Sequence, residues 1–407
     1  MNKLTCCLIS VCLFHAPGVV LGDPGKHSPK GLNPQAMEEL KTVGVNKYMG
    51  EFVPAISQDA GDGWIKHTYD PEGGDGPVCI AGTPYSTFTL ERNPSKLLIM
   101  LQGGGACWQD FYFCNILAGD QAPPPPPVGI WGDSFDTGTE VIPNPIGDWS
   151  VVYMPYCDGS VFSGDNDVVD PNFPFGPIRF HRGLRNVTAG IDLAKSMFPQ
   201  AKEIMLAGSS AGGVGAAGFA PFLARFAFGN NKKLTVFNDA GPVAINLFDV
   251  VSILARSADW LYGQFYPASC TNCDVLGQGT EIIKWRLDND STVREAFYST
   301  DGDETNRFFL SVPTQAQYRN LIVTEHGLIH DAYPDRYKRF IRSGDNSHTA
   351  LQTPLFYVGE ANDVPLHEWV DAFVHDKGKK KKSKKKGKKK GNKPRWEDIV
   401  EDFEPLP

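Results

Sequence analysis

Long apolar runs are nearly absent from this 407-residue sequence, which limits how it can meet a membrane. Only residues 5–20 are mostly apolar, and His15 and Pro17 interrupt them, so they make a poor bilayer span. No other stretch approaches the ~20 apolar residues that a transmembrane helix needs. Because Lys3 precedes this run, residues 1–22 are predicted to be a secretory signal peptide rather than a buried first strand. We therefore predict a soluble, secreted protein without a transmembrane segment.

Motifs for metals, phosphates and repeats are also missing. Cys270 and Cys273 form a C-x-x-C pair, but no second pair and no nearby pair of histidines completes a zinc site. No glycine-rich segment carries the lysine and serine of a Walker loop, and no internal repeat is present. We therefore predict no metal ion, no cofactor and no nucleic-acid partner.

Cysteines are few, and their positions fit an exported chain. Cys6, Cys7 and Cys12 would leave with the signal peptide. An even number then remains, which favours disulfides, although the count does not fix the pairing. The remaining cysteines are Cys79, Cys107, Cys114, Cys157, Cys270 and Cys273. Asn186 and Asn289 lie in N-x-S/T sequons and are candidate glycosylation sites of an exported protein.

Charge is unevenly distributed along the chain. The formal net charge is −8, yet residues 377–393 contain twelve lysines among glycine, serine and asparagine. Such a block buries no apolar surface, so it is predicted to be a solvated, disordered insertion. Its charge favours either adhesion to an anionic polymer or surface, or a passive loop. Residues 23–376 are predicted to form the main domain, and residues 394–407 a final segment that docks on it.

Short apolar runs alternate with helical patterns, which points to a fold class. Each run is bounded by glycine, proline or charge, as expected of strands buried on both faces. The alternation predicts an α/β fold with a mostly parallel central sheet and helices on both faces. The predicted strands span residues 97–101, 151–154, 204–207 and 234–237, and the helices residues 183–197, 214–228 and 244–261. Residues 103–150, with a stiff proline run, and residues 262–320, with little periodicity, are predicted to be two insertions.

A candidate nucleophile follows the third predicted strand. Residues 208–212 fit the pattern G-x-S-x-G, with Ser210 at its centre. A buried strand that runs into this pattern and then into a helix of small residues is typical of a nucleophile elbow, which exposes the serine hydroxyl at the top of a sheet. A plain glycine-rich turn explains the pattern but not its placement. Ser210 is therefore predicted to be catalytic.

A catalytic serine needs an orienting acid and a histidine base, which in this type of fold follow it in that order. His348 lies in a polar, turn-rich loop that suits a reactive imidazole. His326 and His330 are four residues apart, but no third ligand is evident, so packing is predicted for them rather than metal binding. Spacing leaves three candidate acids open: Asp239, Asp301 and Asp303.

Backbone N–H groups would have to stabilise the oxyanion of such a reaction. Residues 102–108 begin with glutamine and three glycines, directly after the predicted strand at 97–101. Consecutive glycines let N–H groups converge without obstruction, as in the glycine-rich oxyanion loops of lipases and esterases. The amide of Ala211, next to the candidate nucleophile, is a further candidate donor.

In their order along the chain, these motifs resemble the pectin acetylesterase family, which includes Notum-type carboxylesterases. The resemblance runs from about Cys79 to His348 and returns near the C-terminus. It rests on residues 78–85, 101–107, 155–157, 180–183, 208–213, 238–241 and 365–370. It implies an α/β-hydrolase-like fold with long loop insertions, and a serine esterase that works through an acyl-enzyme.

Carried over residue by residue, the resemblance implies Ser210 as nucleophile, His348 as base and Asp303 as acid. Asp301 is the second choice for the acid, and Asp239 becomes a structural residue that supports the elbow. The implied oxyanion donors are the amides of Gly105, Ala106 and Ala211. The implied disulfides are Cys79–Cys157 and Cys107–Cys114, which leaves Cys270–Cys273 as a small local loop.

Three positions depart from the family pattern. Ala106 stands where the family usually has tryptophan, and Trp108 follows two residues later. Asn306 stands in place of glutamine, and Thr349 in place of cysteine. These departures bear on the shape of the pocket and on the substrate more than on the chemistry.

The sequence thus predicts a secreted, monomeric serine carboxylesterase that removes acetyl groups from a cell-wall polysaccharide such as pectin. One alternative is a lipid-protein deacylase of the Notum type, which needs a deep apolar pocket. The walls of such a pocket, or aromatic platforms for sugars, would come from Phe111, Tyr112, Phe113, Ile130 and Trp131. A second alternative is a polysaccharide-binding protein that has lost turnover.

Overall fold

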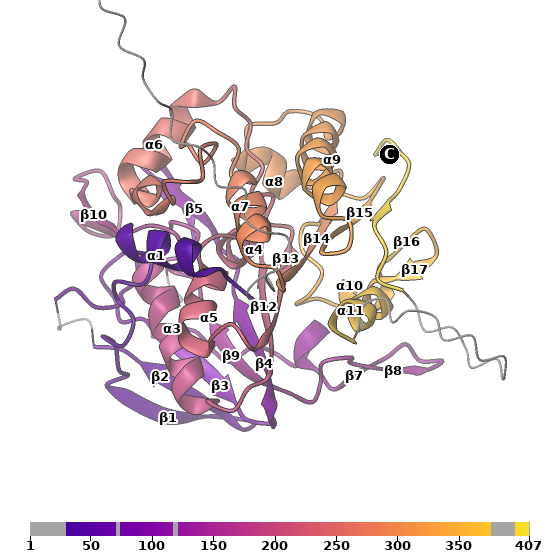
Figure 1. Cartoon of the computed structure of the whole chain (residues 1–407), viewed down its shortest axis with the longest axis horizontal. Coiled ribbons are helices and arrows are strands. Elements are labelled where there is room, and N and C mark those ends of the chain that lie inside the picture. Colours follow the sequence, from indigo (N-terminus) through magenta and orange to yellow (C-terminus); the bar gives the residue numbers. More distant parts are fainter. Residues whose placement is uncertain (1–29, 71–73, 117–120, 376–394, 407) are drawn as a thin grey trace, which may run out of the picture.

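A sheet of ten strands forms the centre of the computed structural model, which describes residues 30–70, 74–116, 121–375 and 395–406 (Figure 1). The predicted signal peptide and lysine-rich insertion lie outside these residues. In spatial order the strands are β1 (Ile56–Gly61), β2 (Trp64–Thr68), β3 (Ser86–Leu90), β9 (Trp149–Met154), β4 (Asn93–Leu101), β12 (Glu203–Ser209), β13 (Lys233–Asp239), β14 (Arg294–Thr300), β15 (Tyr337–Arg342) and β18 (Ile399–Val400).

Strand directions divide the sheet into two parts. From β9 to β18 every neighbouring pair is parallel, whereas β1, β2, β3 and β9 pair antiparallel. The four strands predicted from the sequence lie within β4, β9, β12 and β13, which are adjacent in the parallel part. The predicted α/β fold with a mostly parallel sheet is confirmed.

Both faces of the sheet are covered, as the continuous apolar runs require. Side chains alternate along each strand, so that Leu97, Ile99 and Leu101 of β4 enter one core while Leu98 and Met100 enter another. The first core contains buried residues of α1, α3, α5, α7 and α9, and the second those of α10 and α11. Figure 1 shows α3 and α5 side by side over the sheet, where they contact one another.

The helices cover much of the chain between these strands. They are α1 (Pro34–Thr42), α3 (Gly183–Met197), α4 (Ala211–Ala217), α5 (Ala220–Phe228), α6 (Val250–Trp260), α7 (Glu281–Asn289), α8 (Glu304–Phe309), α9 (Gln315–Ala332), α10 (Leu355–Val358) and α11 (Leu366–His375). Short 3₁₀ helices are η2 (Gly129–Trp131) and η3 (Tyr262–Phe265). Among the described residues, no single helix is long and apolar enough to cross a membrane. Only α4 and α5 taken together, as a bent pair, have the length and composition of a membrane span.

Two predicted helices differ from the observed ones at their boundaries. The helix predicted at 214–228 is two helices, because the chain turns at Gly218 and Pro221 begins α5 anew. The helix predicted at 244–261 begins only at Val250, where the Asp249 side chain accepts a hydrogen bond from the amide of Ser252. Side-chain capping thus decides where α6 starts.

The prediction that residues 262–320 form an insertion with little periodicity is wrong. This stretch contains α7, α8 and β14, and β14 is a central strand of the sheet. Its apolar run is short because Glu295 is buried in it and pairs with Arg286 of α7 at 2.7 Å. Residues 103–150, the other predicted insertion, hold the hairpins β5 (Gly105–Trp108) with β6 (Phe111–Cys114), and β7 (Ser134–Asp136) with β8 (Val141–Pro143).

Covalent and terminal contacts close the fold. Among the described residues, three disulfides join Cys79 to Cys157, Cys107 to Cys114 and Cys270 to Cys273. The first two are the pairings that the resemblance implies, and the third is the local loop that those two leave. After the lysine-rich segment the chain returns to the domain, where β18 pairs with β15 and Trp396 packs on Trp369 and Phe373. The remaining hairpins are β10 (Asn166–Val169) with β11 (Ile178–His181), and β16 (Glu360–Ala361) with β17 (Val364–Pro365).

Asn186 is not an accessible glycosylation site. Its side chain is fully buried in α3. The side-chain N–H of Asn186 donates to the carbonyl oxygen of Val78, and its side-chain oxygen accepts from the backbone amide of Val78. An N-linked sugar at this position is incompatible with the fold. The sequon prediction is therefore wrong for Asn186.

Trp369 of α11 is one of the largest fully buried side chains among the described residues. It is fully buried against Phe237 and Phe340, and its indole N–H donates to the carbonyl oxygen of Glu397 at 2.7 Å. We expect Trp369→Ala to lower the free energy of unfolding by about 3–5 kcal/mol through the lost packing. Urea unfolding measures this loss. Val141→Ala, at an exposed position, is the control and should change stability by less than about 0.5 kcal/mol.

His326 is a core residue of α9, as its predicted packing role requires. Its ring stacks on Phe297 with centroids 3.7 Å apart, and Nε2 donates to the carbonyl oxygen of Pro242 at 2.6 Å. Burial lowers the pKa of His326 to about 3. Among the described residues, no group of three His, Cys, Asp or Glu side chains is placed to hold a metal ion.

This depressed pKa makes stability depend on pH. Below about pH 6.5 an unfolded histidine takes up a proton that the folded His326 refuses. The free energy of unfolding therefore carries no penalty from His326 above about pH 6.5. As the pH drops from there toward 3, this one proton lowers it by about 1.4 kcal/mol per pH unit. We measure the free energy of unfolding in urea at several pH values in this range. Plotted against pH, it should change less steeply in His326→Gln than in the wild type, by about 1.4 kcal/mol per pH unit. Equal slopes for the two proteins would contradict the assignment.

Candidate active site

Five neighbouring parallel strands each carry one part of the candidate site at their carboxyl ends. The glycine-rich loop follows β4, Ser210 follows β12, and Asp239 ends β13. Asp303 lies just after β14, and His348 lies in the loop after β15. Because these strands are adjacent in the order β4-β12-β13-β14-β15, segments far apart in sequence meet at one edge of the sheet.

Ser210 sits on a strained turn between β12 and α4. Its φ and ψ are 55° and −121°, a region that non-glycine residues rarely adopt and that nucleophile elbows use. The turn is tight because the chain passes close to β4. A Cβ on Gly212 would lie 2.1 Å from the carbonyl oxygen of Leu101, so only glycine fits there. The amide of Ser210 donates to the carbonyl oxygen of Asp239 at 2.8 Å.

Asp303 and His348 are in direct contact. Nδ1 of His348 and Oδ2 of Asp303 are 2.7 Å apart, and the Asp303 side chain is fully buried while that of His348 is 23% exposed. Asp303 also caps α8, accepting from the backbone amide of Asn306 at 2.8 Å, and its Oδ2 accepts from the Asn306 side chain at 2.8 Å. The carboxylate is thus fixed where it orients the imidazole.

The far nitrogen of His348 is free to act on a substrate. Its Nε2 is buried and has no hydrogen-bond partner among the described residues. No hydrogen bond joins this atom to Ser210 in the described part of the chain, and such bonds are often long before substrate binds. A base in this position needs an orienting acid on Nδ1, which Asp303 supplies.

Geometry separates the three acids that spacing leaves open. Asp301 points away from His348 and pairs with Arg319 at 2.9 Å, with Gln315 and Ser343 as further donors. Asp239 is fully buried and accepts from the Ser209 hydroxyl and from two amides of the histidine loop. Only Asp303 among the three contacts the imidazole.

The loop after β4 brings backbone amides close to Ser210. Gly105 has a φ of +77°, and a Cβ there would lie 2.0 Å from the carbonyl oxygen of Phe113. Gly105, Ala106 and Ala211 line the same pocket as Ser210. Ala211 is the first residue of α4, where an N–H has no acceptor inside the helix. The three predicted oxyanion donors are therefore gathered around one cavity with the candidate nucleophile.

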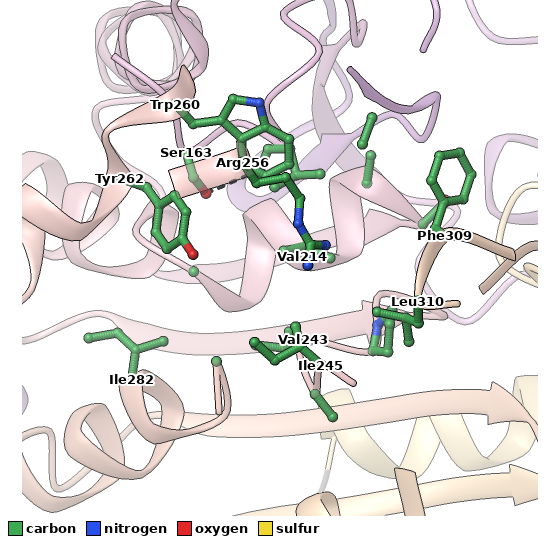
Figure 2. A pocket seen from close by; sticks show the side chains of 18 of the residues that line it. Ser163, Val214, Val243, Ile245, Arg256, Trp260, Tyr262, Ile282, Phe309 and Leu310 are labelled. Atoms are coloured by element: carbon green, nitrogen blue, oxygen red, sulfur yellow. Dashed lines mark hydrogen bonds between the residues drawn. The ribbon is translucent and has the colours of Figure 1, made fainter. Parts of the chain in front are cut away.

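This cavity has a volume of about 160 Å³ and mostly apolar walls. Figure 2 shows two sides of it, with Arg256, Trp260 and Tyr262 opposite Val243, Ile245 and Ile282. The far end is lined by Phe309 and Leu310 beside the acid-bearing turn. One water needs only about 10–15 Å³ of such space, so the cavity has room for more than an acetyl group.

The aromatic residues predicted to line a pocket do not line this one. Ile130 and Trp131 are buried in the second core, and Phe111 stacks behind Trp108 at 3.9 Å between ring centroids. Phe113 is 58% exposed. The pocket takes its aromatic walls instead from Trp108, Phe219, Trp260, Tyr262, Tyr266 and Phe309. Trp108 stands two residues after the position where the family pattern has tryptophan, and it was not among the predicted wall residues.

A buried polar network fixes the α6 wall. The guanidinium of Arg179 donates to Asp170 at 2.8 Å and to Asp259 at 2.7 Å, and also to the Nε2 atom of His181 at 2.7 Å. Burial and the charge of Arg179 lower the pKa of His181 to about 3, so this ring stays neutral and accepts. Next to Asp259, the indole N–H of Trp260 donates to the carbonyl oxygen of Cys107 at 2.8 Å. The pocket wall and the glycine-rich loop are therefore tied together.

Sequence analysis missed the α6 residues for a physical reason. Arg256 and Trp260 are four residues apart and share one face of the helix. Nothing in their spacing separates such a face from an ordinary amphipathic helix. Only the packing of α6 over Trp108 shows that this face closes a pocket.

Comparisons with known proteins bear on the family to which the chain is similar. Residues 132–265, which include Ser210, match the family model described as pectinacetylesterase. The chain is similar to Pectin acetylesterase 11 of Arabidopsis thaliana, with 32% identity over 170 residues, 40% of this chain and 34% of that protein. The alignment thus spans about a third of that relative's length. The resemblance to the pectin acetylesterase family is confirmed.

A solved structure is similar over most of the chain. The Wnt deacylase Notum from Drosophila matches with a TM-score of 0.53 and 17% identity, over 73% of this chain and 90% of that chain. At this identity the likeness concerns the fold, and it confirms the α/β-hydrolase-like architecture.

The contact between Asp303 and His348 makes a prediction about Ser210. Asp303→Asn keeps the shape but not the charge that orients the imidazole. We expect the rate at which a fluorophosphonate probe labels Ser210 to fall on the order of 10⁴-fold, as in other triads that lose this carboxylate. Intact-protein mass spectrometry follows the labelling.

A second Asp–His pair provides the matched control. Asp371 contacts His375 at the same 2.7 Å, but on the surface of α11. Asp371→Asn should label at the wild-type rate. Equal labelling of the two variants would remove Asp303 from the proposed site.

Proposed function

We propose that this protein is a secreted serine carboxylesterase that hydrolyses an ester through an acyl-enzyme on Ser210. The observation that carries the proposal is the contact of the buried Asp303 with His348 at the edge of the sheet where Ser210 occupies the strained turn. Similarity to pectinacetylesterases supports ester hydrolysis as the reaction.

The mechanism follows from the positions of these groups. His348 takes the proton of the Ser210 hydroxyl as its oxygen attacks the ester carbonyl. The amides of Gly105, Ala106 and Ala211 stabilise the oxyanion that forms. His348 then gives the proton to the leaving alcohol. In the second half of the reaction His348 takes a proton from water as the water oxygen attacks the acyl-enzyme, and returns it to the Ser210 oxygen as the free acid leaves. Asp303 holds the imidazole in one tautomer throughout and stabilises its charged form.

Two substrate classes are supported by different observations. The family match favours removal of acetyl groups from a polysaccharide such as pectin. The apolar cavity of about 160 Å³ favours a longer acyl group, as a deacylase acting on an acylated protein would need. A polysaccharide chain stays outside either way, because only an acyl group enters a cavity of this size.

Export is supported by the predicted signal peptide and by the three disulfides, since disulfides persist mainly outside the cytosol. The organisation into residues 1–22, 23–376, 377–393 and 394–407 remains part of the proposal. Adhesion of the lysine-rich insertion to an anionic polymer is a separate proposal, and deletion of 377–393 tests it.

Hydrolysis of p-nitrophenyl acetate, butyrate, octanoate and palmitate tests the proposed function. Ser210→Ala should reduce kcat roughly 10⁶-fold, because no other group forms the acyl-enzyme. A maximum at acetate would favour polysaccharide deacetylation, and a maximum at longer chains the second class.

Ser209→Ala is not a suitable control, because the Ser209 hydroxyl bonds to Asp239. Ser343→Ala also disturbs the bond to buried Asp301, so Ser134→Ala, at an exposed position outside the pocket, is used instead. Wild-type activity in Ser134→Ala with none in Ser210→Ala supports the assignment. Turnover that survives in Ser210→Ala, or a folded wild type inactive on every ester, would overturn it.

A further inference from the structure

Arg256 is the one cationic side chain among the described residues that line the cavity. It projects from α6 into the pocket, as Figure 2 shows, although the other walls are mostly apolar. Its guanidinium lies over the face of Trp108, 5.3 Å from the ring centre. Such stacking holds the charged group in place but does not neutralise it.

No carboxylate in the described part of the chain forms a salt bridge with Arg256. Its only hydrogen bond there runs from Nε to the carbonyl oxygen of Ser252, at 3.2 Å in its own helix. Asp249 lies close enough to favour its charge, but accepts hydrogen bonds from Ser252 and Ser311 instead. Asp274 lines the rim of the cavity and is exposed. Burial lowers the pKa of Arg256, which marks the cost of holding this charge out of water.

The fully buried arginines among the described residues differ from the half-buried Arg256 in this respect. Arg179 pairs with Asp170 and Asp259, Arg225 pairs with Asp290, and Arg286 pairs with Glu295, all at 2.6–2.8 Å. Buried charges in proteins are paired as a rule, because an unpaired one loses its hydration without compensation. Arg256 is half-buried and forms no such pair among the described residues, and the space before its guanidinium is where an anionic partner would sit.

We propose that the pocket selects an acyl group that ends in a carboxylate, which Arg256 binds while Ser210 attacks the ester at the other end. This inference rests on the proposed esterase function. The preferred substrate is then the half-ester of a short dicarboxylic acid. Water hydrolyses its acyl-enzyme, so that the alcohol leaves first and the free dicarboxylate second. An acetyl group would leave Arg256 unpartnered.

The size of the pocket limits the acyl chain. Arg256 and Ser210 line one cavity of about 160 Å³, and the chain that joins the carboxylate to the reacting carbonyl has to fit within it. Tyr262 also lines this region, and burial raises the pKa of its hydroxyl, which keeps it neutral and able to donate to an anion.

Paired esters of equal chain length provide the test. Rates are measured for p-nitrophenyl pentanoate and hexanoate and for the p-nitrophenyl half-esters of glutaric and adipic acid. Ser210→Ala supplies the background, because the half-esters also hydrolyse by themselves. The readout is the ratio of kcat/KM for each half-ester to that of its neutral counterpart.

Arg256→Met keeps the apolar stem over Trp108 and removes the charge. We expect the ratio to fall roughly 10- to 100-fold in this variant, the range of a charge-assisted hydrogen bond. Arg256→Lys should recover part of it, because lysine keeps the charge without the planar fork. Arg395→Met, an exposed position outside the pocket, should leave the ratio at the wild-type value.

The outcomes separate the two levels of the proposal. If Arg256→Met hydrolyses esters and its ratio of half-ester to neutral ester equals that of the wild type, the carboxylate site is overturned but the esterase function stands. If the wild type hydrolyses no ester, the proposed function fails, and calorimetry with adipate then tests the site alone. Adipate that binds wild type more than tenfold tighter than Arg256→Met supports the anion site, and equal binding overturns it.

Discussion

One buried carboxylate holds the parts of the candidate site in register. Asp239, at the end of β13, accepts from the hydroxyl of Ser209 and from the amides of Ala350 and Leu351. Its own carbonyl oxygen accepts from the amide of Ser210. Burial raises the pKa of Asp239, and these donors offset that cost by stabilising the charged form. The strained elbow and the histidine loop therefore persist because both are fixed to the same strand.

Sequence patterns located the parts of this site that have local signatures. Ser210 is recognisable because a buried strand, glycines and a helix surround it within a few residues. The acid is not, because Asp301 and Asp303 occupy the same turn, and only the fold directs one of them to His348 and the other to Arg319. The family resemblance chose Asp303 where spacing alone did not, and the hydrogen bond is consistent with that choice.

The missed elements share a different cause. β14 has a short apolar run because Glu295 in it is neutralised by Arg286, a pairing that spans two elements and leaves no periodic pattern. The pocket was misplaced for a similar reason. Its walls come from α6 and from the segment around Val243, whereas Trp131, a plausible wall residue in the sequence, fills the opposite core. Long-range pairing, rather than local propensity, determines both features.

The bond from Trp260 to Cys107 has a consequence for how this protein can change. Cys107 belongs to the strand that carries Gly105 and Ala106, so the helix that shapes the pocket also braces the amides that we propose as oxyanion donors. Under the proposed mechanism, a substitution at Trp260 that reshapes the pocket therefore also releases the strand that carries the proposed oxyanion donors. Arg256, one turn earlier, reaches the same strand through Trp108, so changes at either position affect both the pocket and the loop.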